Sequence, residues 1–178
     1  MTNRIYAVVG MCGSGKSEAV KRFIEKGYSR VYFGEVVINE IKARNLEVNE
    51  KNERFVREEL REKYGMSAMA VKSLDKIREL FKNGNVVIES LYSWSEFKII
   101  KKEFGDAFKL IAIHTEKEIR YKRLMTREYR PLSFEQSESR DISEIENIEK
   151  GGPICFCDYL IINNSDLGNL FKEIDKII

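Results

Sequence analysis

The eight residues from Gly10 to Ser17 read G-M-C-G-S-G-K-S and match the pattern G-x-x-x-x-G-K-S/T. Glycines let the backbone turn so that successive N–H groups point at phosphate oxygens, and the positive end of a following helix adds to that attraction. The ammonium group of Lys16 could reach the β- and γ-phosphates of a nucleotide, and the Ser17 hydroxyl could ligate Mg²⁺. The pattern therefore predicts a site for a nucleoside triphosphate with Mg²⁺. The residues expected to contact the nucleotide from this loop are Gly10, Cys12, Gly13, Ser14, Gly15, Lys16 and Ser17.

The segments on either side of this loop decide between a nucleotide site and a chance match in a glycine-rich turn. Ile5–Val9 is a short apolar run, which predicts a buried strand. The residues from Gly15 to Glu25 place apolar side chains at helical spacing, and this pattern stops near Gly27. A strand before the loop and a helix after it are the setting in which the motif binds phosphate, so the sequence favours the nucleotide site.

Arginines gather in the last third of the chain. Arg120, Arg123 and Arg127 fall on one predicted helix, and Arg130 and Arg140 follow in a polar stretch. A solvated basic helix is the usual explanation of such a run. Beside a phosphate-binding loop, the same residues could instead form a mobile clamp that neutralises charge on a phosphoryl group during transfer. We favour the clamp.

Two glutamates follow predicted strands and could act at the same site. Glu89 ends the apolar run Asn85–Glu89, where a carboxylate could hold Mg²⁺ or its waters, and Ser17 would be its partner at the metal. The simpler alternative is a strand-end carboxylate that caps a loop. Glu35 follows the second predicted strand and could contact an acceptor or cap a helix.

Apolar, β-branched runs alternate with longer helical patterns along the whole chain. Strands are predicted at Ile5–Val9, Arg30–Phe33, Asn85–Glu89, Phe108–His114 and Tyr159–Ile162. Helices are predicted at Gly15–Glu25, Glu35–Arg44, Glu50–Tyr64, Ser67–Lys82, Ser95–Phe104, Glu116–Arg127, Ser133–Lys150 and Leu167–Ile178. Such alternation indicates βαβ units, and it predicts a three-layer α/β fold with a parallel sheet covered by helices on both faces.

The composition fits one globular domain spanning residues 1–178. The chain is 43% hydrophobic and carries a formal charge of +2, so no strong overall field favours nucleic acid as a partner. No run approaches the roughly 20 apolar residues of a membrane span. Cys12, Cys155 and Cys157 do not suggest a disulfide framework, and the C-x-C pair has no second Cys/His pair with which to bind a metal. We expect a cytoplasmic protein that is a monomer or a homodimer.

Three segments carry a family resemblance. Tyr121–Glu128 (Y-K-R-L-M-T-R-E), Arg140 and Cys157–Ser165 (C-D-Y-L-I-I-N-N-S) resemble the closing half of dephospho-CoA kinases. The spacing of Arg123 and Arg127 is similar to the start of the adenylate kinase lid. The length and layout resemble the archaeal adenylate-kinase-related proteins of the same P-loop kinase group.

The resemblance implies a fold and a set of roles. The fold would be a five-stranded parallel sheet with an acceptor region after the second strand, at about residues 34–80, and a helical lid after the fourth, at about 115–152. Arg123 would stack on the adenine, and Arg127 and Arg140 would contact the phosphates as catalytic residues. Asn163 and Asn164 would lie beside the nucleotide base.

The chain departs from these families in the acceptor region. Dephospho-CoA kinases carry Asp-x-Asp after the second strand, where this chain has F-G-E at Phe33–Glu35, and phenylalanine cannot accept a proton. Adenylate kinases place an arginine where this chain has Ile38, and they carry Asp-Gly and a further arginine where it has Glu89–Ser93. The arginines that could replace the missing ones, or be no more than exposed charges, are Arg44, Arg54, Arg57 and Arg61.

Two functions remain open at this point. The first is a small-molecule kinase that transfers the γ-phosphoryl group of ATP to a nucleotide or nucleotide-like acceptor, of the nucleoside monophosphate or dephospho-CoA type. The second is a nucleotide-binding sensor or regulator that keeps the loop and has lost acceptor chemistry. A GTPase switch is disfavoured because the chain has no Asn-Lys-x-Asp guanine signature. The retained arginines favour the kinase, with a small molecule rather than nucleic acid or a membrane as its partner.

Overall fold

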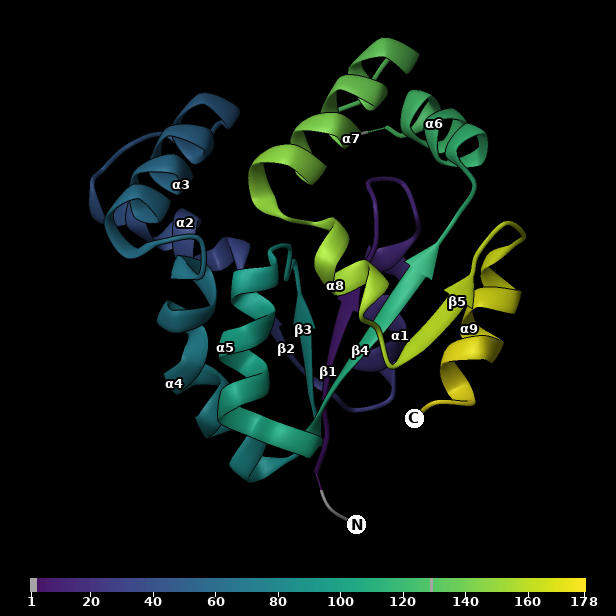
Figure 1. The fold of residues 1–178 in the computed structure, drawn as a ribbon, viewed down its shortest axis with the longest axis horizontal. Helices are drawn as coiled ribbons and strands as arrows, with labels where there is room; N and C mark the ends of the chain where they lie inside the picture. Colours follow the sequence, from purple (N-terminus) through teal and green to yellow (C-terminus); the bar gives the residue numbers. More distant parts are fainter. Residues whose placement is uncertain (1–2, 129) are drawn as a thin grey trace.

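Five parallel strands form one sheet in the order β2-β3-β1-β4-β5 (Figure 1). The structure is a computed structural model that describes residues 3–128 and 130–178. The strands are β1 (Ile5–Val9), β2 (Ser29–Tyr32), β3 (Val86–Glu89), β4 (Phe108–His114) and β5 (Tyr159–Ile162). The predicted five-stranded parallel sheet is confirmed, and the strand bounds differ from the predicted ones by at most one residue.

The strand order reverses beside β1, the central strand. β1 pairs with β3 through Val8 and Glu89, and with β4 through Val9 and Ala112. The chain therefore leaves β1 at the carboxyl edge of the sheet between two strands that run on to opposite sides. Open α/β sheets bind their ligands in the crevice at such a switch point.

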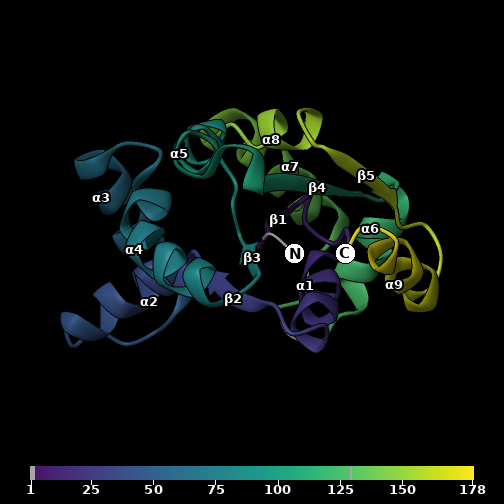
Figure 2. The same ribbon diagram turned by 90° about the horizontal axis from the view of Figure 1, so that it is seen from below.

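Helices cover both faces of the sheet, as Figure 2 shows from below. On one face α1 (Lys16–Glu25) and α9 (Leu167–Asp175) pack over Val8, Val87 and Ile111. On the other face α4 (Ala68–Asn83) and α5 (Trp94–Phe104) pack over the alternate residues of the same strands. Each central strand is buried on both faces, which explains its nearly continuous apolar sequence.

Two groups of helices lie beyond the carboxyl edge of the sheet (Figure 1). The first, α2 (Gly34–Ala43) and α3 (Glu50–Tyr64), follows β2, and the two helices pack against each other and against α4. The second follows β4 and comprises α6 (Lys117–Thr126) and α7 (Phe134–Ile148), after which the short α8 (Gly151–Cys155) returns over the sheet and packs against α5 and β4. A single 3₁₀ turn, η1 (Gly105–Ala107), leads into β4. No helix within the described ranges is long and apolar enough to cross a membrane.

The helix predicted at Ser133–Lys150 ends two residues early, and a short helix that was not predicted follows it. α7 ends at Ile148, Glu149 adopts a left-handed backbone with φ of 55°, and Lys150 precedes α8. The sequence did not predict α8 because two glycines and a proline in its five residues are poor helix formers. Pro153 is nevertheless tolerated, because it lies in the first turn of α8, where its missing N–H would have no partner.

Candidate active site

The loop after β1 has the backbone geometry of a phosphate cradle. Gly13 and Gly15 have φ of 81° and 100°, in the left-handed region that favours glycine. Space also requires glycine, because a Cβ on Gly15 would lie 2.4 Å from Asn163 Nδ2 and one on Gly13 would lie 2.8 Å from the Arg120 carbonyl oxygen. Gly15 directly precedes α1, so the loop N–H groups and the positive helix end meet at one place.

Lys16 begins α1 and folds back over the loop. Its Nζ donates to the Met11 carbonyl oxygen at 2.8 Å. Burial, together with the nearby positive charges of Lys150 and Arg140, lowers the pKa of Lys16 to about 7. Its protonation therefore depends on what lies beside it, and phosphate oxygens would favour the charged form.

Residues that directly follow β4 and β5 hold the loop in place through hydrogen bonds. Asn163, after β5, is buried and donates from Nδ2 to the Ser14 carbonyl oxygen at 2.8 Å. The hydroxyl of Thr115, after β4, donates to that same carbonyl at 3.1 Å and lies 3.0 Å from the Asn163 carbonyl oxygen. Asn163 therefore positions the loop, and its predicted place beside the base stays a prediction. Asn164 instead exchanges hydrogen bonds with Glu116.

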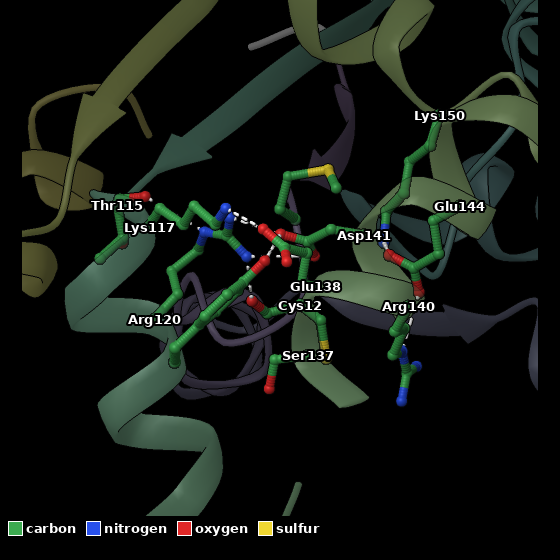
Figure 3. A network of polar contacts seen from close by, with 12 residues as sticks. Cys12, Thr115, Lys117, Arg120, Ser137, Glu138, Arg140, Asp141, Glu144 and Lys150 are labelled. Carbon is green, nitrogen blue, oxygen red and sulfur yellow. Dashed lines mark hydrogen bonds and ion pairs between the residues drawn. The ribbon is translucent and has the colours of Figure 1, made fainter. Parts of the chain in front are cut away.

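Arg120 joins the loop to both lid helices, as Figure 3 shows. The buried guanidinium binds Asp141 of α7 with both terminal nitrogens, at 3.2 and 2.6 Å, and donates to the Cys12 carbonyl oxygen at 3.0 Å. The Tyr121 hydroxyl donates to the same carboxylate at 3.1 Å. The sequence grouped Arg120 with the clamp arginines, but its hydrogen bonds are already taken by protein groups, so its role is to hold the loop and the lid together.

A second charged cluster on the lid contains Arg140, Glu144 and Lys150 (Figure 3). The Glu144 carboxylate lies between the two cations, 3.1 Å from Arg140 Nε and 2.5 Å from Lys150 Nζ. Burial alone would raise the pKa of Glu144, but Lys150 and Arg140 hold it below its ordinary value. Lys150 is only 3% exposed, and its Nζ lies 4.6 Å from the centre of the Tyr92 ring. Sequence reasoning missed both Glu144 and Lys150, which resembled the surface charges around them.

Two further predicted clamp residues, Arg123 and Arg127, lie on and directly after α6. Arg123 is half-buried, with its guanidinium 3.5 Å from the Thr115 hydroxyl and donating to the Ser165 carbonyl oxygen at 3.1 Å. Arg127, directly after the helix, donates from Nε to the Arg130 carbonyl oxygen at 2.6 Å. Arg123 therefore borders the loop support, whereas Arg127 lies toward the lid tip. Their contacts with the adenine and the phosphates stay predictions.

The predicted metal ligands lie in different surroundings. Ser17 is exposed in the first turn of α1, next to Lys16. Glu89, at the end of β3, binds Arg30 of β2 through Oε2, at 2.6 Å from Nε and 2.5 Å from Nη2. Across residues 3–128 and 130–178, no three His, Cys, Asp or Glu side chains are grouped to hold a metal ion. One hydroxyl and one carboxylate, from Ser17 and Glu89, suit Mg²⁺, which keeps several waters and relies on substrate phosphates rather than an all-protein cage.

A pocket opens between α3 and the ends of β2 and β3, in the predicted acceptor region. Its free space is about 510 Å³, part of it open to solvent. Phe33, Val37 and Met69 supply an apolar wall. The polar lining comes from Tyr32, Glu53, Arg57, Arg61, Ser90, Tyr92 and Glu96. Tyr92 connects the pocket to the lid, because its side chain lines the pocket and its ring contacts Lys150.

Glu35 and Trp94 do not line this pocket. Glu35, in the first turn of α2, forms an ion pair with Lys76 of α4 at 2.5 Å. Trp94 stacks on Phe97 with ring centres 4.8 Å apart and packs edge-on against Phe156. Both therefore hold helices together.

Comparison with known proteins identifies the family. The chain is 34% identical over 178 residues to a UPF0200 protein from Thermococcus onnurineus, in a match that covers 98% of this chain and 96% of that protein. This chain belongs to the UPF0200 family. Residues 7–146 also match the family described as AAA domain. The matched residues include the P-loop, the predicted acceptor region and most of α7.

Solved structures similar to this UPF0200 member include kinases of the same fold. Shikimate kinase from Bacteroides thetaiotaomicron has a TM-score of 0.65 at 12% identity, covering 98% of this chain and 96% of that one. Dephospho-CoA kinase from Campylobacter jejuni has a TM-score of 0.55 at 19% identity, covering 99% and 96%. The predicted resemblance to the P-loop kinase group is confirmed at the level of fold.

Proposed function

We propose that this protein is a phosphotransferase that moves the γ-phosphoryl group of Mg-ATP to a small nucleotide or nucleotide-like acceptor. One observation carries the proposal: the phosphate loop and the pocket beside α3 adjoin through Tyr92. This side chain lines the pocket, and its ring lies 4.6 Å from Lys150, whose charge also acts on Lys16. A transferase needs two substrate sites side by side, whereas a protein that only binds a nucleotide needs one.

The loop would hold the triphosphate through its backbone N–H groups and Lys16. Ser17 would ligate Mg²⁺, and Glu89 would hold one of its waters while keeping its contact with Arg30. Bound Mg²⁺ supplies charge neutralisation at the β- and γ-phosphates. Arg123 would lie against the adenine.

During transfer, an acceptor oxygen forms a bond to the γ-phosphorus while the bond from that phosphorus to the β–γ bridging oxygen breaks. The bridging oxygen leaves with ADP and takes the electron pair. Lys16, Arg127 and Arg140 would neutralise the negative charge that moves with the phosphoryl group, and Lys150 would add a further cation. Arg140 and Lys150 are both held by Glu144 and would turn from it to the phosphates.

The ends of β2 and β3 favour an anionic acceptor oxygen. A hydroxyl acceptor needs a base, and the position that carries aspartate in dephospho-CoA kinases is the buried Phe33 here. A phosphate oxygen is already anionic and needs no base. Kinases with the same fold, among them shikimate kinase and dephospho-CoA kinase, support a phosphotransferase that acts on a small molecule, whereas the choice of a phosphate acceptor rests on Phe33.

The second candidate is a nucleotide-binding regulator without transfer activity. The Arg30–Glu89 ion pair favours it, because Arg30 already contacts the carboxylate expected near Mg²⁺. The two functions differ in whether ATP is consumed when an acceptor is present.

The test is ADP release from Mg-ATP, with nucleoside monophosphates and dephospho-CoA offered one at a time. We expect release that depends on one acceptor class and is lost in Lys16→Ala. A second variant, Arg54→Ala, changes an exposed arginine outside the cleft and should retain full activity. Tight ATP binding without release for any acceptor would instead support the regulator.

A further inference from the structure

Arg57 and Arg61 stand apart from the other arginines of the chain. They are four residues apart on α3, so they share one face of the helix, and both line the pocket. Each other arginine makes at least one hydrogen bond or ion pair. Within residues 3–128 and 130–178, neither Arg57 nor Arg61 makes one, and the buried Nε of Arg61 has no acceptor.

Neither carboxylate of the pocket forms an ion pair with Arg57 or Arg61, although the charge of Glu96 acts favourably on Arg61 from a greater distance. Glu96 uses one oxygen to accept from the backbone N–H groups of Tyr92 and Ser93, at 2.7 and 2.9 Å, and so caps α5. Glu53 lies 3.6 Å from Arg130 of the lid. The pocket therefore keeps two cationic groups without a counter-ion in contact.

The neighbouring arginines show that this arrangement is not general on α2 and α3. Arg44 binds Glu59 through two hydrogen bonds, at 2.9 and 2.8 Å. Arg54 pairs with Glu58 at 2.8 Å, although Glu58 is also close in sequence to Arg57 and Arg61.

Burial lowers the pKa of Arg61, which reflects the cost of enclosing its charge. Natural proteins that retain a buried charge without a partner commonly do so at a functional site.

We propose that Arg57 and Arg61 bind the phosphate of a phosphomonoester, which is the acceptor substrate; this inference rests on the proposed function. Two guanidinium groups match the two negative charges of a phosphomonoester, and their fork geometry suits its oxygens. The tyrosine and serine hydroxyls at the ends of β2 and β3 can donate further hydrogen bonds. The wall of Phe33, Val37 and Met69 suits a flat apolar ring attached to that phosphate.

The test measures binding alone, so that it does not depend on turnover. Protein saturated with Mg-AMP-PNP is titrated calorimetrically with phenyl phosphate, an aromatic phosphomonoester, and separately with benzoate, which offers one negative charge. We expect phenyl phosphate to bind more tightly than benzoate. Arg57→Ala and Arg61→Ala should each lower the affinity for phenyl phosphate by about 10- to 100-fold, while the affinity for Mg-AMP-PNP stays unchanged.

Arg54→Ala is the matched control, because Arg54 lies on the same helix but is exposed and paired with Glu58. It should leave phenyl phosphate binding unchanged. Equal binding of benzoate, equal loss in Arg54→Ala, or no loss in either pocket variant would overturn the proposal. If the wild-type protein did not bind Mg-AMP-PNP, that result would instead contradict the proposed function.

A stability measurement separates ligand binding from a structural role. Arg61→Leu removes a buried charge that has no partner and supplies apolar volume, so the melting temperature should rise. Phenyl phosphate binding should fall in the same variant. A lower melting temperature would show that Arg61 stabilises the fold, and it would overturn the assignment of this residue to a ligand.

Discussion

Lys16 links the charge state of the free site to nucleotide binding. Its pKa of about 7 in the protein lies well below the ordinary lysine value because of burial and two neighbouring cations. Above pH 7 the amine is therefore largely neutral until an anion reaches it. Phosphate oxygens raise the pKa again, so binding and protonation are coupled.

We predict that Mg-ATP binding at pH 8, without acceptor, takes up close to one proton. At pH 6 the uptake should disappear, because Lys16 is already protonated in the free protein. Calorimetry in Tris and in HEPES measures the uptake from the difference in enthalpy. Lys16→Arg keeps a permanent charge and should show no uptake at either pH; an uptake equal to that of the wild type would contradict the assignment to Lys16.

Asn163 holds the loop backbone, and we expect it to affect nucleotide binding through that backbone. Asn163→Ala leaves the buried Ser14 carbonyl with one donor fewer, and we expect the free energy of unfolding to fall by about 1–2 kcal/mol. Mg-ATP should also bind more weakly. Urea denaturation and calorimetry measure the two effects. Asn164→Ala is the control, since its bonds to Glu116 are near the surface, and equal effects of both changes would refute the role of Asn163.

At the scale of elements, a buried ion pair joins the two lid helices, and a hydrogen bond from the same arginine connects them to the P-loop. Arg120 contacts Asp141 of α7 and the Cys12 carbonyl at the same time. Removing one partner of a buried pair is costly because the other charge stays uncompensated. The exposed pair Lys117–Glu138 joins the same two helices without that burial.

Asp141→Asn should therefore lower the free energy of unfolding by about 3 kcal/mol, as measured in urea. The matched change Glu138→Gln should cost at most about 0.5 kcal/mol, because exposed pairs contribute little. The double variant Arg120→Met with Asp141→Leu should recover much of the stability, since no buried charge remains. Equal costs for the two single changes would contradict the distinction between the pairs.

The elements themselves could be predicted from hydrophobic periodicity and turn residues. Ile5–Val9 and Phe108–His114 were located to the residue because each is a short apolar run with clear ends. The break at Glu149 was missed, since a glutamate in a left-handed backbone leaves no local signal. α8 depends on packing against α5 and β4, which the sequence does not show.

At the scale of the whole molecule, the site is assembled from segments far apart in the chain. The loop motif alone predicted the phosphate cradle, because local spacing determines that chemistry. Lys150 and Tyr92 could not be paired from the sequence, as they meet only when the chain after α7 returns over the loop that follows β3. Among four candidate arginines, only the structure distinguishes the paired Arg44 and Arg54 from the two that face the pocket unpaired.

The central claim is that the cradle and the pocket form one reaction cleft, and label transfer tests it most directly. The protein is incubated with Mg-ATP labelled at the γ-phosphate and with nucleoside monophosphates as acceptors, and the labelled products are separated. We predict that label enters an acceptor in equal amount to the ADP formed, and that Lys16→Ala abolishes both. Label found only in inorganic phosphate, or ATP bound without any transfer, would contradict the account.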